Sequence, residues 1–145
     1  MVFFKNMMGQ KKRSTFSHVN HVFKCPTLST NRNISNNLNL LYRYLCKNKT
    51  NLVIGGDHSL SIATLSYSLR NYGNNFKVIW VDAHADINST ASSHSKNIHG
   101  MVLNYICGVE HNRPHFTFIH YRKINLKNIL YIVLRDPDTY EQSLI

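Results

Sequence analysis

Asp82, His84 and Asp86 alternate in the stretch WVDAHADIN, directly after an apolar run. Alternate residues of an extended chain point to the same side, so two carboxylates and one imidazole can converge. This donor set suits a divalent transition metal such as Mn, Fe, Co or Zn. A carboxylate can also bridge two cations, and a two-metal site activates a shared water. In the alternative interpretation, Asp82 caps a helix and His84 is an ordinary loop residue.

Polar clusters follow each of three predicted strands. They are GGDH at residues 55–58, DAHAD at residues 82–86 and DPD at residues 136–138. In open α/β sheets, ligands bind at the edge that the carboxyl ends of the strands form. Three polar clusters at one such edge indicate a binding site. They also add His58 as a fourth candidate metal ligand.

The apolar pattern around these clusters predicts alternating helices and strands. Ile34, Leu38, Leu41 and Leu45 follow helical spacing, whereas the strands are short continuous apolar runs. The predicted helices cover residues 35–47, 59–72 (capped near Asp57 or Ser59) and 100–107. The predicted strands cover residues 52–54, 76–82 and 129–134. Continuous apolar strands that alternate with helices predict an α/β fold with a parallel sheet.

The charge of the chain is unevenly distributed. The 145 residues, enough for one domain, have a formal net charge of +10. Residues 1–56 hold nine of the 17 Lys and Arg and no Asp or Glu. We therefore divide the chain into a basic, irregular segment, 1–33, and an α/β domain, 34–145. Nucleic-acid binding by the basic third is the less favoured explanation of this charge, because a biased composition explains it equally well.

Several features bear on where the protein resides. No apolar run reaches the length of a membrane span. The three cysteines are widely spaced and form no CxxC motif, which favours a reducing compartment. We therefore expect a cytoplasmic protein without membrane attachment. Residues 1–30 are basic and contain Ser but no acid, so mitochondrial targeting is the alternative.

The stretches LVIGGDHSLSIAT, VIWVDAHADIN and SKNIHGM together resemble the ureohydrolase superfamily, and specifically arginase. A weaker likeness resumes at ILYIVLRDPDTYE. The resemblance implies a three-layer fold, in which a parallel sheet carries helices on both faces and which is incomplete here. It also implies a binuclear Mn²⁺ enzyme that hydrolyses L-arginine to L-ornithine and urea. Assembly into a homo-oligomer is a further option.

The resemblance assigns roles to individual residues. Residues that match metal ligands are His58, Asp82, His84 and Asp86, with Asp82 as the bridging ligand and Asp86 also counted as catalytic. His99 matches a catalytic histidine that transfers protons. Residues that match the substrate-binding set are Asn88, Ser95 and Asn97 on the α-carboxylate side, and Asp138 and Glu141 at the α-amino group.

The sequence also departs from the family pattern. The family completes its two metal sites with a further Asp-x-Asp pair on a later strand, which has no counterpart before Ile145. Lys96 stands where the family tolerates a glycine. Two alternatives therefore stand beside the arginase interpretation. One is a pseudoenzyme or partner-binding fragment, and the other is a different ureohydrolase such as an agmatinase.

Overall fold

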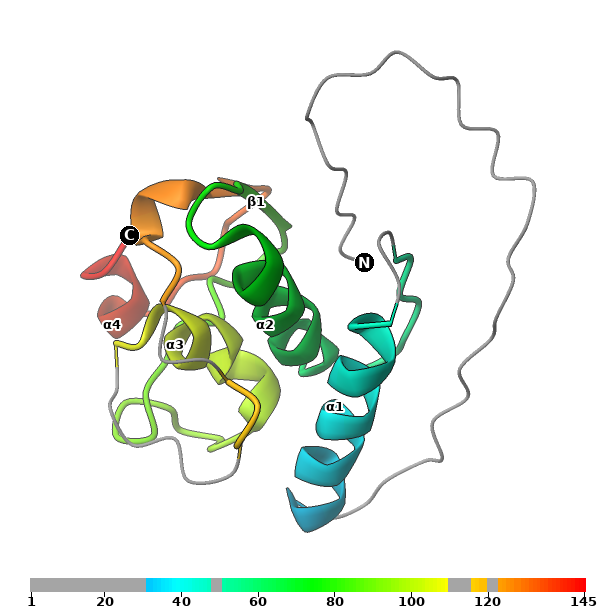
Figure 1. The fold of residues 1–145 in the computed structure, drawn as a ribbon. Helices are drawn as coiled ribbons and strands as arrows, with labels where there is room; N and C mark the ends of the chain where they lie inside the picture. Colours follow the sequence, from blue (N-terminus) through cyan, green and yellow to red (C-terminus); the bar gives the residue numbers. More distant parts are fainter. Residues whose placement is uncertain (1–30, 48–50, 110–115, 120–122) are drawn as a thin grey trace.

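The computed structural model describes residues 31–47, 51–109, 116–119 and 123–145 (Figure 1). The helices are α1 (Asn31–Leu45), α2 (Leu60–Tyr72), α3 (Val102–Cys107) and α4 (Thr139–Gln142). The strands are β1 (Val78–Val81) and β2 (Ile129–Ile132), and the short 3-10 helices are η1 (Ile98–Met101) and η2 (Leu126–Asn128).

Helix α1 is amphipathic. Leu38, Leu41 and Leu45 follow one another at helical spacing and are buried, and α1 packs against α2. The helix begins at Asn31 rather than at the predicted residue 35 and ends at Leu45. The last residues of the segment 1–33 are therefore helical rather than irregular, and residues 1–30 lie outside the described part of the chain.

Helix α2 lies between α1 and α3 (Figure 1). The backbone N–H of Ser59 donates to Asp57 Oδ1 over 2.8 Å, so Asp57 supplies the acceptor at the entry to the helix. Gly73 has a φ of 58° and its N–H donates to Leu69 O, which ends the helix where the sequence predicts. Since α2 is buried along most of its length, it forms the centre of the hydrophobic core.

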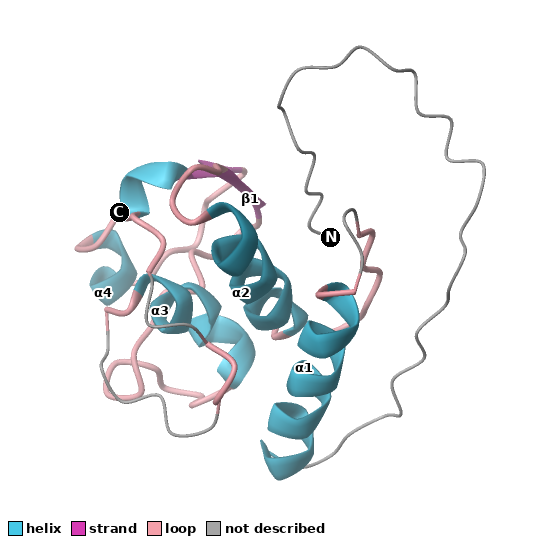
Figure 2. Cartoon of the chain, viewed as in Figure 1, coloured by secondary structure: helices cyan, strands magenta, loops and turns pink. Residues whose placement is uncertain are grey.

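The strands β1 and β2, magenta in Figure 2, pair in parallel, as predicted. Trp80 lies opposite Tyr131. Val78 and Trp80 are buried in the core that also includes α2 and α3. The opposite face carries the exposed side chains of Ile79, Val81, Leu130 and Ile132, which we call the outer sheet face. Ile79 pairs with Leu130 and Val81 with Ile132, so the four side chains form a continuous apolar surface.

The prediction of a strand at residues 52–54 was wrong. These residues carry no regular secondary structure, and the side chain of Ile54 is 79% exposed. An apolar run becomes a strand only when a neighbouring strand accepts its hydrogen bonds, and the sheet pairs β1 with β2 alone among the described residues. The other two strands are shorter than predicted, and the φ of 67° at Val133 takes the chain out of the extended conformation after β2.

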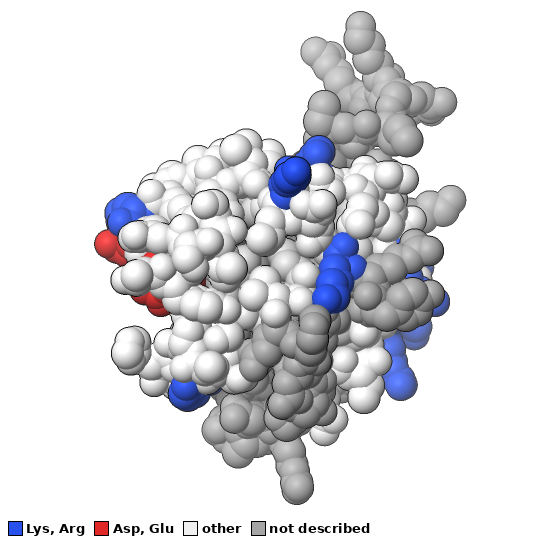
Figure 3. Space-filling view, turned by 90° about the vertical axis from the view of Figure 1, so that its left-hand side faces the viewer, with Lys and Arg blue, Asp and Glu red and all other residues white. Residues whose placement is uncertain are grey.

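The surface charge and the helix lengths bear on the predictions about nucleic-acid binding and membrane attachment. On the face that Figure 3 shows, the described Lys and Arg side chains lie in separate groups, one of them beside Asp and Glu side chains. The described residues visible there do not form a continuous basic stripe of the kind typical of nucleic-acid binding. Within the described ranges, none of the helices is long and apolar enough to span a membrane.

Candidate metal centre

His58, Asp82 and Asp86 converge at one end of the sheet. Asp86 Oδ2 lies 2.7 Å and Asp82 Oδ2 lies 3.2 Å from His58 Nδ1. One potential ligand atom from each residue lies within 4.8 Å of the others. The loop after β1, which carries Asp82 and Asp86, and the entry to α2, which carries His58, therefore bring three of the four predicted metal ligands together.

The ring of His58 is held by Trp80. The two rings stack with their centroids 4.3 Å apart and their planes 18° from parallel. Trp80 is 1% exposed and lies in β1, so it offers a rigid support. The face of the imidazole is thereby fixed, and Nδ1 points at the two carboxylates.

Asp86 is buried and has an unusual backbone conformation. Its φ of 50° lies in the left-handed region, which is sparsely populated for residues other than glycine. The carbonyl oxygen of Asp86 accepts the N–H of Leu103 over 2.8 Å. The N–H of the next residue, Ile87, donates to Glu141 Oε1 over 3.1 Å. Hydrogen bonds to Leu103 and Glu141 therefore hold both ends of the peptide group that follows Asp86.

His84 lies outside the group of converging ligand atoms. Its side chain is 60% exposed, and Nδ1 lies 3.4 Å from Asp82 Oδ1. The same Asp82 Oδ1 also accepts the backbone N–H of His84 over 3.0 Å. The Asp82 carboxylate thus lies between two histidines, with Oδ2 toward His58 and Oδ1 toward His84.

His99, the predicted proton-transfer residue, lies beside Asp57. Its Nδ1 is 3.9 Å from Asp57 Oδ2, and both side chains are at least half exposed. Partial burial of Asp57 acts to raise its pKa, but hydrogen bonds from Ser59 and the nearby His99 and His58 outweigh this effect. The pKa of Asp57 is therefore lowered, which favours its ionised form beside the imidazole.

Three of the predicted substrate residues form one network. The Asn88 side-chain amide donates to Asp138 Oδ2 over 2.7 Å, and the N–H of Glu141 donates to Asp138 Oδ1 over 2.9 Å. Partial burial acts to raise the pKa of Asp138, but the hydrogen bonds from Glu141, Asn88 and Tyr140 and the charge of His94 lower it overall. Glu141 is 4% exposed, whereas Asp138 is accessible to solvent.

Ser95 and Asn97 lie further along the loop that joins β1 to η1. Ser95 Oγ accepts the backbone N–H of Asn97 over 3.3 Å. Between them, Lys96 has a φ of 58°, consistent with a position where a glycine is tolerated. The Lys96 ammonium donates to Thr90 O over 2.5 Å and to Ala91 O over 3.3 Å, so carbonyl oxygens of its own loop bind it.

Sequence reasoning missed the contribution of Trp80 to the site and overlooked a capping role for Glu141. Trp80 was assigned only to a strand, and a period-2 pattern does not indicate which neighbouring ring an aromatic residue supports. Glu141 was assigned to substrate binding, although DTYE at residues 138–141 matches a capping box, in which a polar N-cap residue is followed three positions later by Glu. The structure contains this capping box at α4, so that pattern was the available signal.

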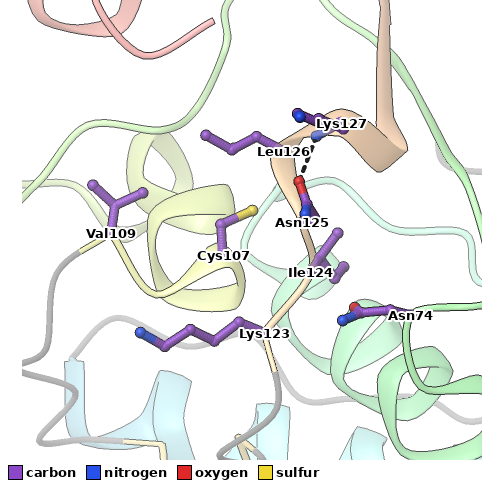
Figure 4. A pocket seen from close by; sticks show the side chains of 8 residues that line it. All are labelled: Asn74, Cys107, Val109, Lys123, Ile124, Asn125, Leu126 and Lys127. Atoms are coloured by element: carbon purple, nitrogen blue, oxygen red, sulfur yellow. Dashed lines mark hydrogen bonds between the residues drawn. The ribbon is translucent and has the colours of Figure 1, made fainter.

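Two hollows on the described part of the surface differ in their distance from the candidate ligands. One of about 250 Å³ borders the candidate ligands, and His58, Asp82 and Asp57 line it together with residues of the α2 entry. The other, of about 480 Å³, is lined by Cys107, Lys123, Lys127 and neighbouring side chains (Figure 4). None of the candidate ligands lines the second hollow, so the first one is the relevant approach to the site.

The donor chemistry of His58, Asp82 and Asp86 fits a divalent metal ion. One imidazole nitrogen and two carboxylates form a mixed nitrogen and oxygen set of the kind that Mn²⁺ and Zn²⁺ accept. The two carboxylates lie close to one imidazole nitrogen, so a cation bound among the three groups would be neutralised by both carboxylates. His58 and Asp82 line the hollow beside these ligands, so an ion bound there would be accessible from that hollow.

Comparisons with known proteins agree on one family. A family model described as the arginase family matches residues 7–145. The arginase of Emericella nidulans is 38% identical over 112 residues, which cover 72% of this chain and 35% of that protein. The arginase of Plasmodium berghei is 40% identical over 97 residues, which cover 65% of this chain and 27% of that protein. The chain spans about a third of the length of these relatives.

Solved structures show the same relationship. The crystal structure of the arginase from Bacillus subtilis strain 168 superposes with a TM-score of 0.70 and 34% identity, and covers 78% of this chain and 40% of that one. The Entamoeba histolytica arginase in complex with L-ornithine gives a TM-score of 0.63 and 32% identity over 77% of this chain and 40% of that one. The prediction of an arginase-like parallel sheet with helices, present here in part, is confirmed.

Proposed function

Because this chain belongs to the arginase family, we propose that its site serves the Mn²⁺-dependent hydrolysis of L-arginine to L-ornithine and urea. The convergence of His58 with Asp82 and Asp86 is the observation that carries the proposal. The chain spans about a third of its curated relatives, so the proposal concerns the site that this chain contributes to the reaction.

In this proposal, His58, Asp82 and Asp86 hold Mn²⁺, and His84 joins them through its contact with Asp82. Bound Mn²⁺ would lower the pKa of a coordinated water and so supply a hydroxide nucleophile near neutral pH. Trp80 contributes by fixing the imidazole plane of His58, which reduces the entropy lost when the ligands assemble.

His99 is proposed to move protons at the edge of the site. Its imidazole is half exposed and lies 3.9 Å from the Asp57 carboxylate, so it can exchange protons with solvent and with the reacting guanidinium nitrogen. The Asp57 carboxylate, whose pKa is lowered, lies beside this imidazole and can orient it toward a departing amine.

Substrate recognition is proposed for the polar residues beside the metal centre. Asn88 and Asp138 lie together and are exposed enough to meet the amino-acid end of arginine. The ionised Asp138 carboxylate complements an α-ammonium group. Ser95 and Asn97 carry hydrogen-bond donors further along the same loop as Asn88 and are proposed to meet the α-carboxylate. Agmatine lacks that carboxylate, so a preference for arginine over agmatine tests these assignments.

The direct test measures urea release by the purified full chain with L-arginine, with and without Mn²⁺. We expect Mn²⁺-dependent release that is stronger with L-arginine than with agmatine. Asp86→Asn should abolish it, because the substitution removes a charged ligand but keeps the side-chain volume. Equal release from agmatine would favour the agmatinase alternative. A chain that binds no Mn²⁺ and releases no urea would refute the proposal.

A second candidate function, partner binding, is favoured by the outer sheet face. Ile79, Val81, Leu130 and Ile132 are each at least 40% exposed, and apolar surface of this kind marks interaction sites. A second copy of the chain is the proposed partner, since one self-complementary patch on each copy is sufficient for a symmetric dimer. The oligomeric state of the purified chain tests this candidate.

A further inference from the structure

Both carboxylate oxygens of Glu141 accept hydrogen bonds from backbone N–H groups. Its Oε1 accepts the N–H of Ile87 over 3.1 Å, and its Oε2 accepts the N–H of Asp138 over 3.3 Å. Glu141 is 4% exposed. Direct contact with a substrate ammonium would require this side chain to leave both N–H groups, and a buried N–H without an acceptor is costly. The geometry therefore points to a positioning role for Glu141.

The contact to Ile87 lies next to a metal-centre residue. The N–H of Ile87 and the C=O of Asp86 belong to the same peptide group. Its oxygen accepts the N–H of Leu103 over 2.8 Å, and its N–H donates to Glu141. Both poles of this one peptide plane are therefore held, one by α3 and the other by α4.

This peptide plane sets the direction of the Asp86 side chain. Asp86 has a φ of 50°, a conformation that persists only where the surroundings enforce it. From this backbone, its carboxylate reaches to 2.7 Å from His58 Nδ1. A relaxation of Asp86 into an ordinary conformation would turn the carboxylate away from His58.

We propose that Glu141 is a positioning residue of the metal centre, which holds the Asp86–Ile87 peptide so that the Asp86 carboxylate faces His58. This inference rests on the proposed metal-binding function. Glu141 is itself fixed by the capping box of α4, in which Asp138 accepts the Glu141 N–H over 2.9 Å. The short helix α4 thus stabilises a metal-ligand conformation in a distant part of the sequence.

The test uses the full chain with Glu141→Ala and Glu141→Gln, and with Thr139→Ala as the matched control. Thr139 is exposed in the same helix and takes no part through its side chain in the capping box. Mn²⁺ affinity is measured by electron paramagnetic resonance of the free ion. Partners that orient metal ligands typically contribute about 10–100-fold in affinity, so Glu141→Ala should weaken binding by about that factor. Glu141→Gln keeps one acceptor oxygen, so its Mn²⁺ affinity should lie between those of Glu141→Ala and the wild type. Thr139→Ala should have the Mn²⁺ affinity of the wild type.

A second measurement needs no metal. Hydrogen exchange of the Ile87 amide should accelerate about tenfold in Glu141→Ala, the effect of one lost hydrogen bond. The Ile124 amide, which donates to Ile106 O elsewhere in the core, should be unchanged. If circular dichroism shows that Glu141→Ala does not fold, the Mn²⁺ affinity and the Ile87 exchange rate of Glu141→Gln test the proposal instead.

The outcomes separate this inference from the proposed function. Wild-type affinity for Mn²⁺ in a folded Glu141→Ala variant would overturn the positioning role while the metal centre stands. A wild-type chain that binds no Mn²⁺ would refute the metal function, and the exchange of the Ile87 amide would then decide alone. An unchanged rate at Ile87 would overturn the role of Glu141, and a selectively faster rate would support it.

Discussion

Asp86 Oδ2 lies 2.7 Å from His58 Nδ1, and this contact is the shortest between an imidazole and a carboxylate among the described residues. The two residues reach it from different segments, one at the entry to α2 and the other in the loop after β1. Asp86 contributes from a buried, left-handed position, and His58 from a ring that rests on Trp80.

Asp86→Asn is expected to weaken Mn²⁺ binding by more than about tenfold. Changes in residues that only orient a ligand already cost about 10–100-fold, and this change removes the charge of a candidate ligand itself. Isothermal titration of the full chain with MnCl₂ measures the effect. Asp136→Asn is the matched control, since Asp136 is exposed and lies outside the metal-centre group. Equal affinity in the two variants would contradict a ligand role for Asp86.

His84→Ala is expected to weaken Mn²⁺ binding less than His58→Ala does. His84 is 60% exposed and touches only one carboxylate oxygen of Asp82, whereas His58 faces both carboxylates. The same titration ranks the two variants. An equal loss in both would indicate that His84 is drawn fully into the site when metal binds. Unfolding curves of both variants without metal serve as the control for general destabilisation.

Trp80→Ala is expected to lower the free energy of unfolding by about 3–5 kcal/mol, the usual cost of truncating a buried Trp. Trp80 is 1% exposed and supports His58, so the substitution creates a cavity and also frees the imidazole ring. Trp80→Phe keeps an aromatic support and should lose less of both stability and Mn²⁺ affinity. Urea denaturation followed by circular dichroism measures the first effect. A Trp80→Phe variant as unstable as Trp80→Ala would argue against the role of ring stacking.

Ionised Asp138 is expected to raise the free energy of unfolding, and this contribution is expected to disappear at acidic pH. Its folded pKa is lowered below the ordinary value of 3.8, because the hydrogen bonds from Glu141 and Asn88 outweigh partial burial. A group with a depressed folded pKa stabilises the folded state above its unfolded pKa. That contribution is lost as the pH falls from about 3.8 through the folded pKa.

Thermal unfolding of the wild type and of Asp138→Asn between about pH 6 and about pH 2.5 tests this prediction. The difference in midpoint should be largest above pH 3.8 and should shrink in more acidic buffer. A difference that grows as the pH falls would contradict the assigned direction of the pKa shift.

Leu130→Lys is expected to reduce self-association. Leu130 is 58% exposed and Ile79, its partner across the sheet, is 53% exposed, so a charge at this point interrupts the outer sheet face. Sedimentation velocity over a range of protein concentrations measures the association. Thr139→Lys adds the same charge at an exposed position away from the sheet and should behave as the wild type does. A monomeric wild-type chain would contradict the prediction.

The alternation of Asp82, His84 and Asp86 shows where sequence reasoning stops. An extended chain would send all three side chains to one side, but β1 ends at Val81, and Asp86 has a left-handed φ. The alternation therefore does not persist through the motif. His84 remains exposed, and Asp86 turns inward through its own backbone conformation.

The sequence alone determined the parallel α/β arrangement, the positions of α2 and both strands, and the chemical types of the candidate ligands. These follow from apolar periodicity, glycine positions and the side-chain inventory, which are local properties of the chain. The tertiary structure decided that residues 52–54 do not form a strand, that Trp80 supports His58, and that Glu141 faces Ile87 rather than solvent. Each of these three features depends on a residue far away in the sequence. Local sequence patterns do not indicate which distant residues come into contact.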